Sequence, residues 1–290
     1  MIAGFICEKT GDPTPYEDCI DCARTRVNRK LNCPFDEATL VGMILNQKRK
    51  DEITVTKLSS CPRSVYIDRH FDHFVYPSAM FWAFRGQIAH KIMEEAHIHE
   101  DAIAEQRFER EWEGIKISGT PDLILPQQRV LKDFKTSKAV PSYKNKDGVI
   151  LAYENHRVQV NTYRWLVKPN YEIAELEIVY FSMEETLLCP VEVWPDEAKR
   201  KTDMTIDRYL EERLVPLKMA LDSGTMPPYA RTWSCDGYCG VSEICHKELK
   251  KEILAARKVV KLKKGDKANV RSSNNTKRGS DDNNTAVYCR

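Results

Sequence analysis

The segment VLKDFKTSK, residues 130–138, places an acid and a base two positions apart in a run that is typical of a β-strand. Side chains alternate along a strand, so Asp133 and Lys135 should share one face while Phe134 points to the other. An aspartate beside a lysine is often no more than a weak surface ion pair. The same two side chains can also hold a cation and act on a phosphate, so the neighbouring motifs have to decide between these interpretations.

A second aspartate stands at the start of another β-rich run. Asp122 lies in SGTPDLIL, directly after a Gly-Thr-Pro turn. Two adjacent strands with a short connection would bring Asp122 and Asp133 together, and two close carboxylates repel each other unless a cation neutralises them. Oxygen ligands of this kind suit Mg²⁺ or Mn²⁺. Such a cation would activate water and stabilise charge on a phosphate, with Lys135 orienting the water or holding the negative charge.

Two further motifs lie on predicted helices. His90 follows Gly86 by four positions in a predicted amphipathic helix over residues 79–100. Gln159 and Tyr163, four positions apart, share one face of a predicted helix over residues 154–168. Taken alone, His90 is better explained as a half-buried helix histidine, and the other two as ordinary helix side chains.

In their order along the chain, these four motifs resemble the RecB-like branch of the PD-(D/E)xK nuclease superfamily, over roughly residues 52–250. The resemblance implies an α/β, restriction-endonuclease-like core with a mixed central sheet flanked by helices. It also implies a divalent-metal-dependent deoxyribonuclease, an exonuclease on single-stranded ends, that works in repair, recombination, replication or CRISPR adaptation.

The resemblance assigns roles to individual residues. The Mg²⁺ or Mn²⁺ ligands would be the side chains of His90, Asp122 and Asp133 and the backbone carbonyl of Phe134. The catalytic residues would be Asp122, Asp133 and Lys135. Support of the site and contacts to DNA would come from Gln159, Tyr163 and Arg63, the last through a phosphate.

The segment WSCDGYCGVSEIC contains a group of three cysteines, Cys235, Cys239 and Cys245. A zinc site would need a second close pair nearby, and this end of the chain offers none. Together with the distant Cys61, the triplet resembles the iron–sulfur subgroup of RecB-like nucleases, which includes the CRISPR adaptation exonuclease, the AddB subunit and phage relatives. The resemblance implies a structural 4Fe–4S cluster on four thiolates. Three residues separate Cys235 from Cys239, where the subgroup often has two.

A second group of cysteines lies near the start of the chain: Cys7, Cys19, Cys22 and Cys33. Four thiolates can close a tetrahedral zinc site, and this segment has few large apolar residues with which to build a core of its own. Reduced cysteines in a loose arm, or a second cluster, remain alternatives. The sequence therefore predicts three parts: a cysteine-rich, zinc-binding module at 1–50, the nuclease domain at 51–262 and a disordered polar tail at 263–290.

Composition limits the remaining options. The formal net charge of +2 neither requires nor excludes nucleic acid, because a local basic groove can hide in a balanced total. No apolar run is long enough for a membrane span, and the first residues make a poor secretory signal, so we expect a cytoplasmic location, or the host cytoplasm for a viral protein. The rival function is a DNA-binding scaffold without turnover. An iron–sulfur redox enzyme is a third option, but no dinucleotide fingerprint supports it.

Overall fold

The structure is a computed structural model that describes residues 2–45, 52–95, 100–182, 184–230, 235 and 239–254. Contacts divide the chain into two units, Met1–Ser242 and Glu243–Arg290. In the second unit, residues 243–254 are helical. The predicted tail at 263–290 lies outside the described residues.

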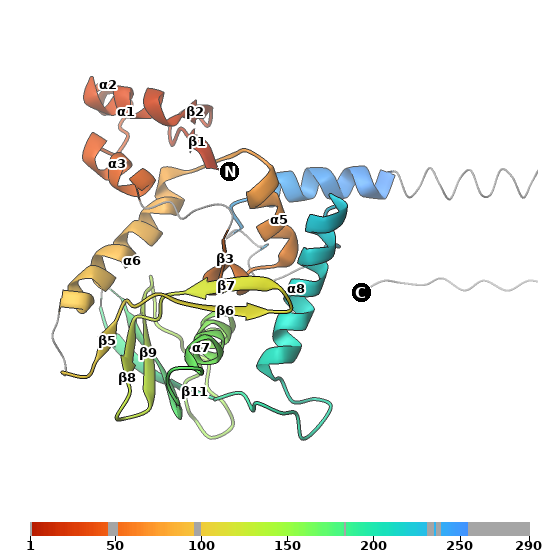
Figure 1. Ribbon diagram of the computed structural model, residues 1–290. Helices are drawn as coiled ribbons and strands as arrows, with labels where there is room; N and C mark the ends of the chain where they lie inside the picture. Colours follow the sequence, from red (N-terminus) through yellow and green to blue (C-terminus); the bar gives the residue numbers. More distant parts are fainter. Residues whose placement is uncertain are drawn as a thin grey trace, which may run out of the picture. The chain divides into compact units, whose positions relative to one another are not determined.

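The main sheet has five strands in the order β11-β10-β9-β8-β5 (Figure 1). Its strands are β5 (Ile103–Ala104), β8 (Leu123–Leu125), β9 (Val130–Thr136), β10 (Glu175–Phe181) and β11 (Thr186–Val191). The β9–β10 pair is parallel and the other three pairs are antiparallel, so the sheet is mixed. The predicted α/β fold with a mixed sheet flanked by helices is thereby confirmed.

Two smaller sheets are also found among the described residues. One has the order β3-β7-β6 and the other the order β2-β1-β4. Their strands are β3 (Ile53–Thr54), β6 (Phe108–Trp112) and β7 (Ile115–Gly119), and β1 (Ile2–Ile6), β2 (Pro13–Pro15) and β4 (His73–Val75). Because β1 pairs with β4 in parallel, the cysteine-rich segment shares a sheet with residues beyond the predicted boundary at 50.

The helices fall into three stretches of the chain. The first 45 residues contribute α1 (Tyr16–Arg24), α2 (Val27–Lys30) and α3 (Glu37–Leu45). Residues before the main sheet contribute α4 (Val55–Leu58), α5 (Pro62–His70) and α6 (Pro77–Glu95). Further along the chain are α7 (Glu154–Val167), between β9 and β10, and α8 (Ile206–Ser223), ahead of the helical residues 243–254.

Helix α7 is the central element of the core. It contacts β9 and β10 of the main sheet as well as β6 and β7 of the neighbouring sheet. Most of its residues from Val158 onward are buried, as expected for a helix with packing partners on several sides. Gly119, at the end of β7, lets this helix come close: a Cβ there would lie 2.7 Å from the Tyr163 ring.

Two helices show how local contacts set their bounds and their faces. Helix α8 begins at Ile206, where Thr205 caps it by accepting a hydrogen bond from the Arg208 backbone N–H at 3.3 Å. The predicted apolar face of α6 is not a core face throughout. Phe84 packs against the cluster around Phe5, whereas Ile88 and Ile92 are exposed.

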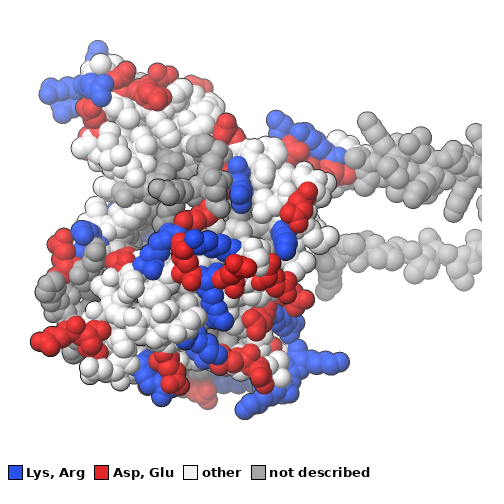
Figure 2. All heavy atoms as spheres, in the orientation of Figure 1, with Lys and Arg blue, Asp and Glu red and all other residues white. Residues whose placement is uncertain are grey.

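The described surface carries charges of both signs. On the face shown in Figure 2, Lys and Arg side chains are interspersed with Asp and Glu. No helix within the described ranges combines the length and the apolar character that a membrane span needs. On this face a nucleic acid would therefore be attracted by local groups and not by a uniform positive field.

Candidate active site

Three of the expected ligands meet where α6 faces the ends of β8 and β9. The His90 Nδ1 atom lies 3.1 Å from Asp122 Oδ1, and the His90 Nε2–H donates to the Phe134 carbonyl at 2.9 Å. The second oxygen of Asp122, Oδ2, accepts a hydrogen bond from the Phe134 backbone N–H at 2.5 Å. Residues on α6, just before β8 and on β9 are thus brought together.

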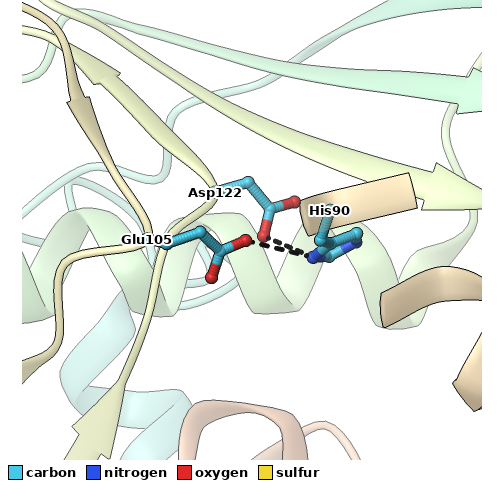
Figure 3. Close-up of side chains that lie close together, drawn as sticks. All are labelled: His90, Glu105 and Asp122. Atoms are coloured by element: carbon cyan, nitrogen blue, oxygen red, sulfur yellow. Dashed lines mark ion pairs between the residues drawn. The ribbon is translucent and has the colours of Figure 1, made fainter. Parts of the chain in front are cut away.

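Glu105 joins this group and was not expected from the sequence. It directly follows β5, has a left-handed φ of 50°, and donates its backbone N–H to the Asp122 carbonyl at 3.2 Å. Its Oε1 atom lies 3.3 Å from His90 Nδ1 (Figure 3). In the sequence, Glu105 is only an acidic residue after a short apolar run. This pattern is too common to identify a metal ligand. Glu105 reaches the site because β5 pairs with β8.

Asp133 and Lys135 share one face of β9, as alternation predicts. The Lys135 Nζ atom lies 2.7 Å from Asp133 Oδ2. Asp133 is completely buried, and apart from this ion pair neither of its carboxylate oxygens has a hydrogen-bond partner among the described residues. Burial raises the pKa of Asp133 to about 6, with Lys135 opposing the shift and Asp122 adding to it. A buried carboxylate in this condition is a fitting partner for a cation.

Lys135 is held in its charged form. Burial favours the neutral amine, but Asp133 and Asp122 outweigh this effect and raise the pKa of Lys135. Tyr163 lies close enough to interact electrostatically with Lys135, and its hydroxyl accepts a hydrogen bond from the Nε2–H of the buried Gln159 at 3.1 Å. Burial and, after it, Asp133 raise the pKa of Tyr163 to about 12. The site therefore presents an ammonium and a neutral phenol, which donate hydrogen bonds and do not abstract protons.

The arrangement fits a divalent cation. Atoms of His90, Glu105 and Asp122 that can bind a metal lie within 4.8 Å of one another. Neighbouring ligands of an octahedral cation, each about 2.1 Å from the ion, are separated by about 3 Å, close to the two distances from His90 Nδ1. Asp133 is not part of this trio, but it lies close enough to interact electrostatically with Asp122 and His90.

The stability of the metal-free chain should depend on His90. Hydrogen bonds with Asp122 and then Glu105 raise the pKa of His90 to about 10, against the opposing effect of burial. The folded-state pKa lies above the unfolded value, so the stabilisation is complete below about pH 6.5 and is lost as the pH rises towards 10. The loss should be at most about 5 kcal/mol. We expect thermal unfolding in excess chelator to show this decline for the wild type but not for His90→Gln.

Arg63 takes a different position from the one expected. Its side chain is 1% exposed, and its guanidinium donates to the Pro227 carbonyl at 2.9 Å. This burial argues against the expected phosphate contact and makes Arg63 a support residue that ties α5 to the chain near residue 227. The sequence around Arg63 does not distinguish an arginine that contacts a phosphate from one that supports the fold.

The expected iron–sulfur ligands occupy several segments. Cys61 is buried at the N-cap of α5, where its Sγ accepts a hydrogen bond from the Ser64 backbone N–H at 3.3 Å. Cys235 and Cys239 are half-buried, and Cys245 is a buried residue of the second unit. The residues 236–238 that separate the first two members of the triplet lie outside the described part.

Comparison with known proteins identifies the class. The family model described as the PD-(D/E)XK nuclease superfamily matches residues 87–246, which is more than half of the chain and includes His90, Asp122, Asp133 and Lys135. The chain therefore belongs to the PD-(D/E)XK nuclease superfamily. The matched range also includes Cys235, Cys239 and Cys245. It begins after Cys61 and after the first four cysteines of the chain.

Two solved structures show limited similarity. The crystal structure of SSO0001 has 22% sequence identity and a TM-score of 0.48, covering 72% of this chain and 93% of that one. A protein from Eubacterium rectale with a provisional exonuclease name has 16% identity and a TM-score of 0.28, covering 77% of this chain and 79% of that one. No curated protein sequence matches the chain. The family assignment thus rests on the family model.

Proposed function

We propose that this chain is a divalent-metal-dependent deoxyribonuclease that hydrolyses phosphodiester bonds. The observation that carries the proposal is the buried Asp133 carboxylate, paired with the Lys135 ammonium at 2.7 Å and lying near the cluster of His90, Glu105 and Asp122. Burying an aspartate and a lysine together costs stability, so a purely structural role does not explain why the pair is there. Buried charged pairs of this kind are common in active sites. Membership of the nuclease superfamily supports the same conclusion.

The residues proposed to hold the cation are His90, Asp122, Asp133 and the carbonyl of Phe134, with Glu105 as an additional ligand. A bound Mg²⁺ or Mn²⁺ supplies Lewis acidity towards a phosphate oxygen and lowers the pKa of water. The imidazole nitrogen of His90 favours Mn²⁺ over Mg²⁺, because Mg²⁺ prefers oxygen ligands alone.

The other site residues act on the phosphate and on each other. Lys135, kept charged by the two aspartates, places an ammonium where negative charge develops and can orient the attacking water by a hydrogen bond. Asp133 fixes the position of that ammonium. Gln159 and Tyr163 form a buried, hydrogen-bonded pair, and its tyrosine would help to keep bulk water away from Lys135.

Glu105 should contribute to metal affinity. Replacing Glu105 with Gln removes one negative charge beside His90, so we expect the Kd for Mn²⁺ to rise about 10-fold or more. Titration of Mn²⁺ followed by electron paramagnetic resonance measures this without any turnover. Glu111→Gln, an exposed glutamate on β6, is the matched control and should leave the Kd unchanged. Equal affinities for Glu105→Gln and wild type would remove Glu105 from the metal site.

A 4Fe–4S cluster on Cys61, Cys235, Cys239 and Cys245 is the second part of the proposal. Four thiolates suit such a cluster, and Cys61 lies at the N-cap of α5, where its Sγ accepts the Ser64 backbone N–H. Its role would be to join segments far apart in the sequence. Iron analysis of anaerobically purified protein should find about four irons per chain, lost in Cys239→Ser.

Single-stranded DNA ends are the proposed substrate, by resemblance to iron–sulfur relatives in repair, recombination, replication or CRISPR adaptation. Incubation of matched linear and circular single strands with Mn²⁺ separates the modes of action. Loss of the linear strand alone supports an exonuclease, whereas nicking of the circle identifies an endonuclease. If neither strand is cleaved by metal-loaded protein, the alternative proposal gains support: a DNA-binding scaffold subunit in a larger complex.

A further inference from the structure

The first 45 residues contain a group of four cysteines that the nuclease proposal does not use. Cys7, Cys19, Cys22 and Cys33 carry reduced thiols in the structure. The Cys19 thiol lies close enough to each of the other three to interact with it electrostatically, and the Cys22 thiol likewise interacts with Cys33 and Cys7. We propose that these four cysteines form a zinc centre, separate from the nuclease site, that stabilises the N-terminal part of the fold.

Three short elements bring the thiols to one place. Cys19 and Cys22 lie three positions apart on α1 and therefore on one face of the helix. Cys7 follows β1 in a tight turn, in which its N–H donates to the Asp12 carbonyl at 2.8 Å and its carbonyl accepts from the Gly11 N–H at 2.9 Å. Cys33 follows α2, with its N–H bonded to the Asn28 carbonyl at 2.9 Å.

Asn28 holds the chain around the last of the four cysteines. The Asn28 side chain is buried and donates to the Phe35 carbonyl at 2.8 Å, which holds the chain on both sides of Cys33.

The local core gives a reason for a metal. Among the described residues, this region has five buried apolar side chains, Phe5, Ala23, Phe35, Leu40 and Met43. Nine partly buried side chains pack against them, Cys19 and Cys33 among these. A core this small supplies little stability, and small folds commonly add a structural metal for that reason. Four thiolates without a histidine or an open position match a closed structural zinc site and not a catalytic one.

Zinc should also tighten the structure. Among the described residues, the ligand atoms that already have metal-binding spacing are those of His90, Glu105 and Asp122, so the four cysteine sulfurs are more widely spaced. Zinc holds its sulfurs about 2.3 Å away and would therefore draw the turn at Cys7 and the loop at Cys33 towards α1. Binding energy of this kind appears as folding energy, so chelation should lower the Tm of the full chain.

The test is a metal count on the full-length protein purified without added zinc. We expect about one zinc per chain in the wild type, and loss of that zinc in the double variant Cys19→Ser, Cys22→Ser. Asp122→Asn, which removes a ligand of the nuclease site, should keep its zinc. Cys289→Ser, which removes a thiol outside both cysteine groups, is the matched control and should also keep it.

Two results would overturn the proposal: a wild type without zinc, and zinc that is retained in the double variant but lost in Asp122→Asn. Iron in place of zinc at this group would overturn the choice of metal. If the double variant does not fold, exchange of the wild-type zinc for Co²⁺ provides the answer. Thiolate-to-cobalt absorption with the visible bands of a tetrahedral ion supports four sulfur ligands, and their absence contradicts them. DNA cleavage does not enter either measurement, so the nuclease proposal can fail independently.

Discussion

Replacing Lys135 with alanine should lower the rate of DNA cleavage by about 10²–10³-fold while the Kd for Mn²⁺ changes little. The lysine is not a metal ligand, and its ammonium is proposed to act on the charge that develops on the phosphate. Its removal should therefore affect the chemical step and spare metal binding. Single-turnover cleavage and Mn²⁺ titration, made on the same preparation, separate these two effects.

Lys132→Ala is the matched control for this change. Lys132 lies on the same strand but on its opposite face, where it pairs with Glu177 at 2.7 Å. It should retain wild-type cleavage. Because Lys135→Ala leaves the buried Asp133 carboxylate without its ammonium, the metal-free variant should also be less stable, by about 3 kcal/mol or more. Wild-type cleavage by a folded Lys135→Ala protein would show that the lysine has no catalytic role.

The second large effect is expected from Asp122. Its side chain approaches His90 through Oδ1, accepts the Phe134 N–H through Oδ2, and its carbonyl accepts the Glu105 N–H. Asp122→Asn preserves the shape of the side chain but removes its charge. We expect Mn²⁺ affinity to fall by about 10–100-fold and cleavage at low Mn²⁺ to fall by at least as much.

The dependence on Mn²⁺ concentration identifies the cause of the Asp122→Asn defect. Lost metal affinity predicts partial recovery of cleavage as Mn²⁺ is raised, whereas the Lys135→Ala defect should persist at every concentration. If Asp122→Asn bound Mn²⁺ as tightly as the wild type, the proposed ligand set would be wrong. Circular dichroism and thermal unfolding establish that each variant is folded before either comparison is made.

Local patterns were sufficient to predict most of the nuclease core. Alternation along residues 130–136 placed Asp133 and Lys135 on one face, and the structure has this arrangement on β9. The predicted helix over 154–168 appears as α7, with Gln159 and Tyr163 joined by a hydrogen bond. These predictions succeed because strand and helix periodicity depend on neighbours in the sequence.

The misjudged features depend on tertiary contacts. Glu105 enters the site only through the pairing of β5 with β8, and nothing in its own neighbourhood signals this. Periodicity identified an apolar face of α6 but could not tell that Ile88 and Ile92 have no core to pack against. The buried guanidinium of Arg63 donates a hydrogen bond to the Pro227 carbonyl, and Pro227 is more than half the chain away in sequence.

The most direct test of the central claim is single-turnover cleavage of end-labelled single-stranded DNA with Mn²⁺ by the wild type beside Asp133→Asn. The substitution changes one buried carboxylate and leaves the shape of the side chain almost intact. Our account predicts metal-dependent cleavage by the wild type and a loss of about 10³-fold or more in the variant. Equal cleavage by both proteins, or none by folded, Mn²⁺-loaded wild type, would contradict it.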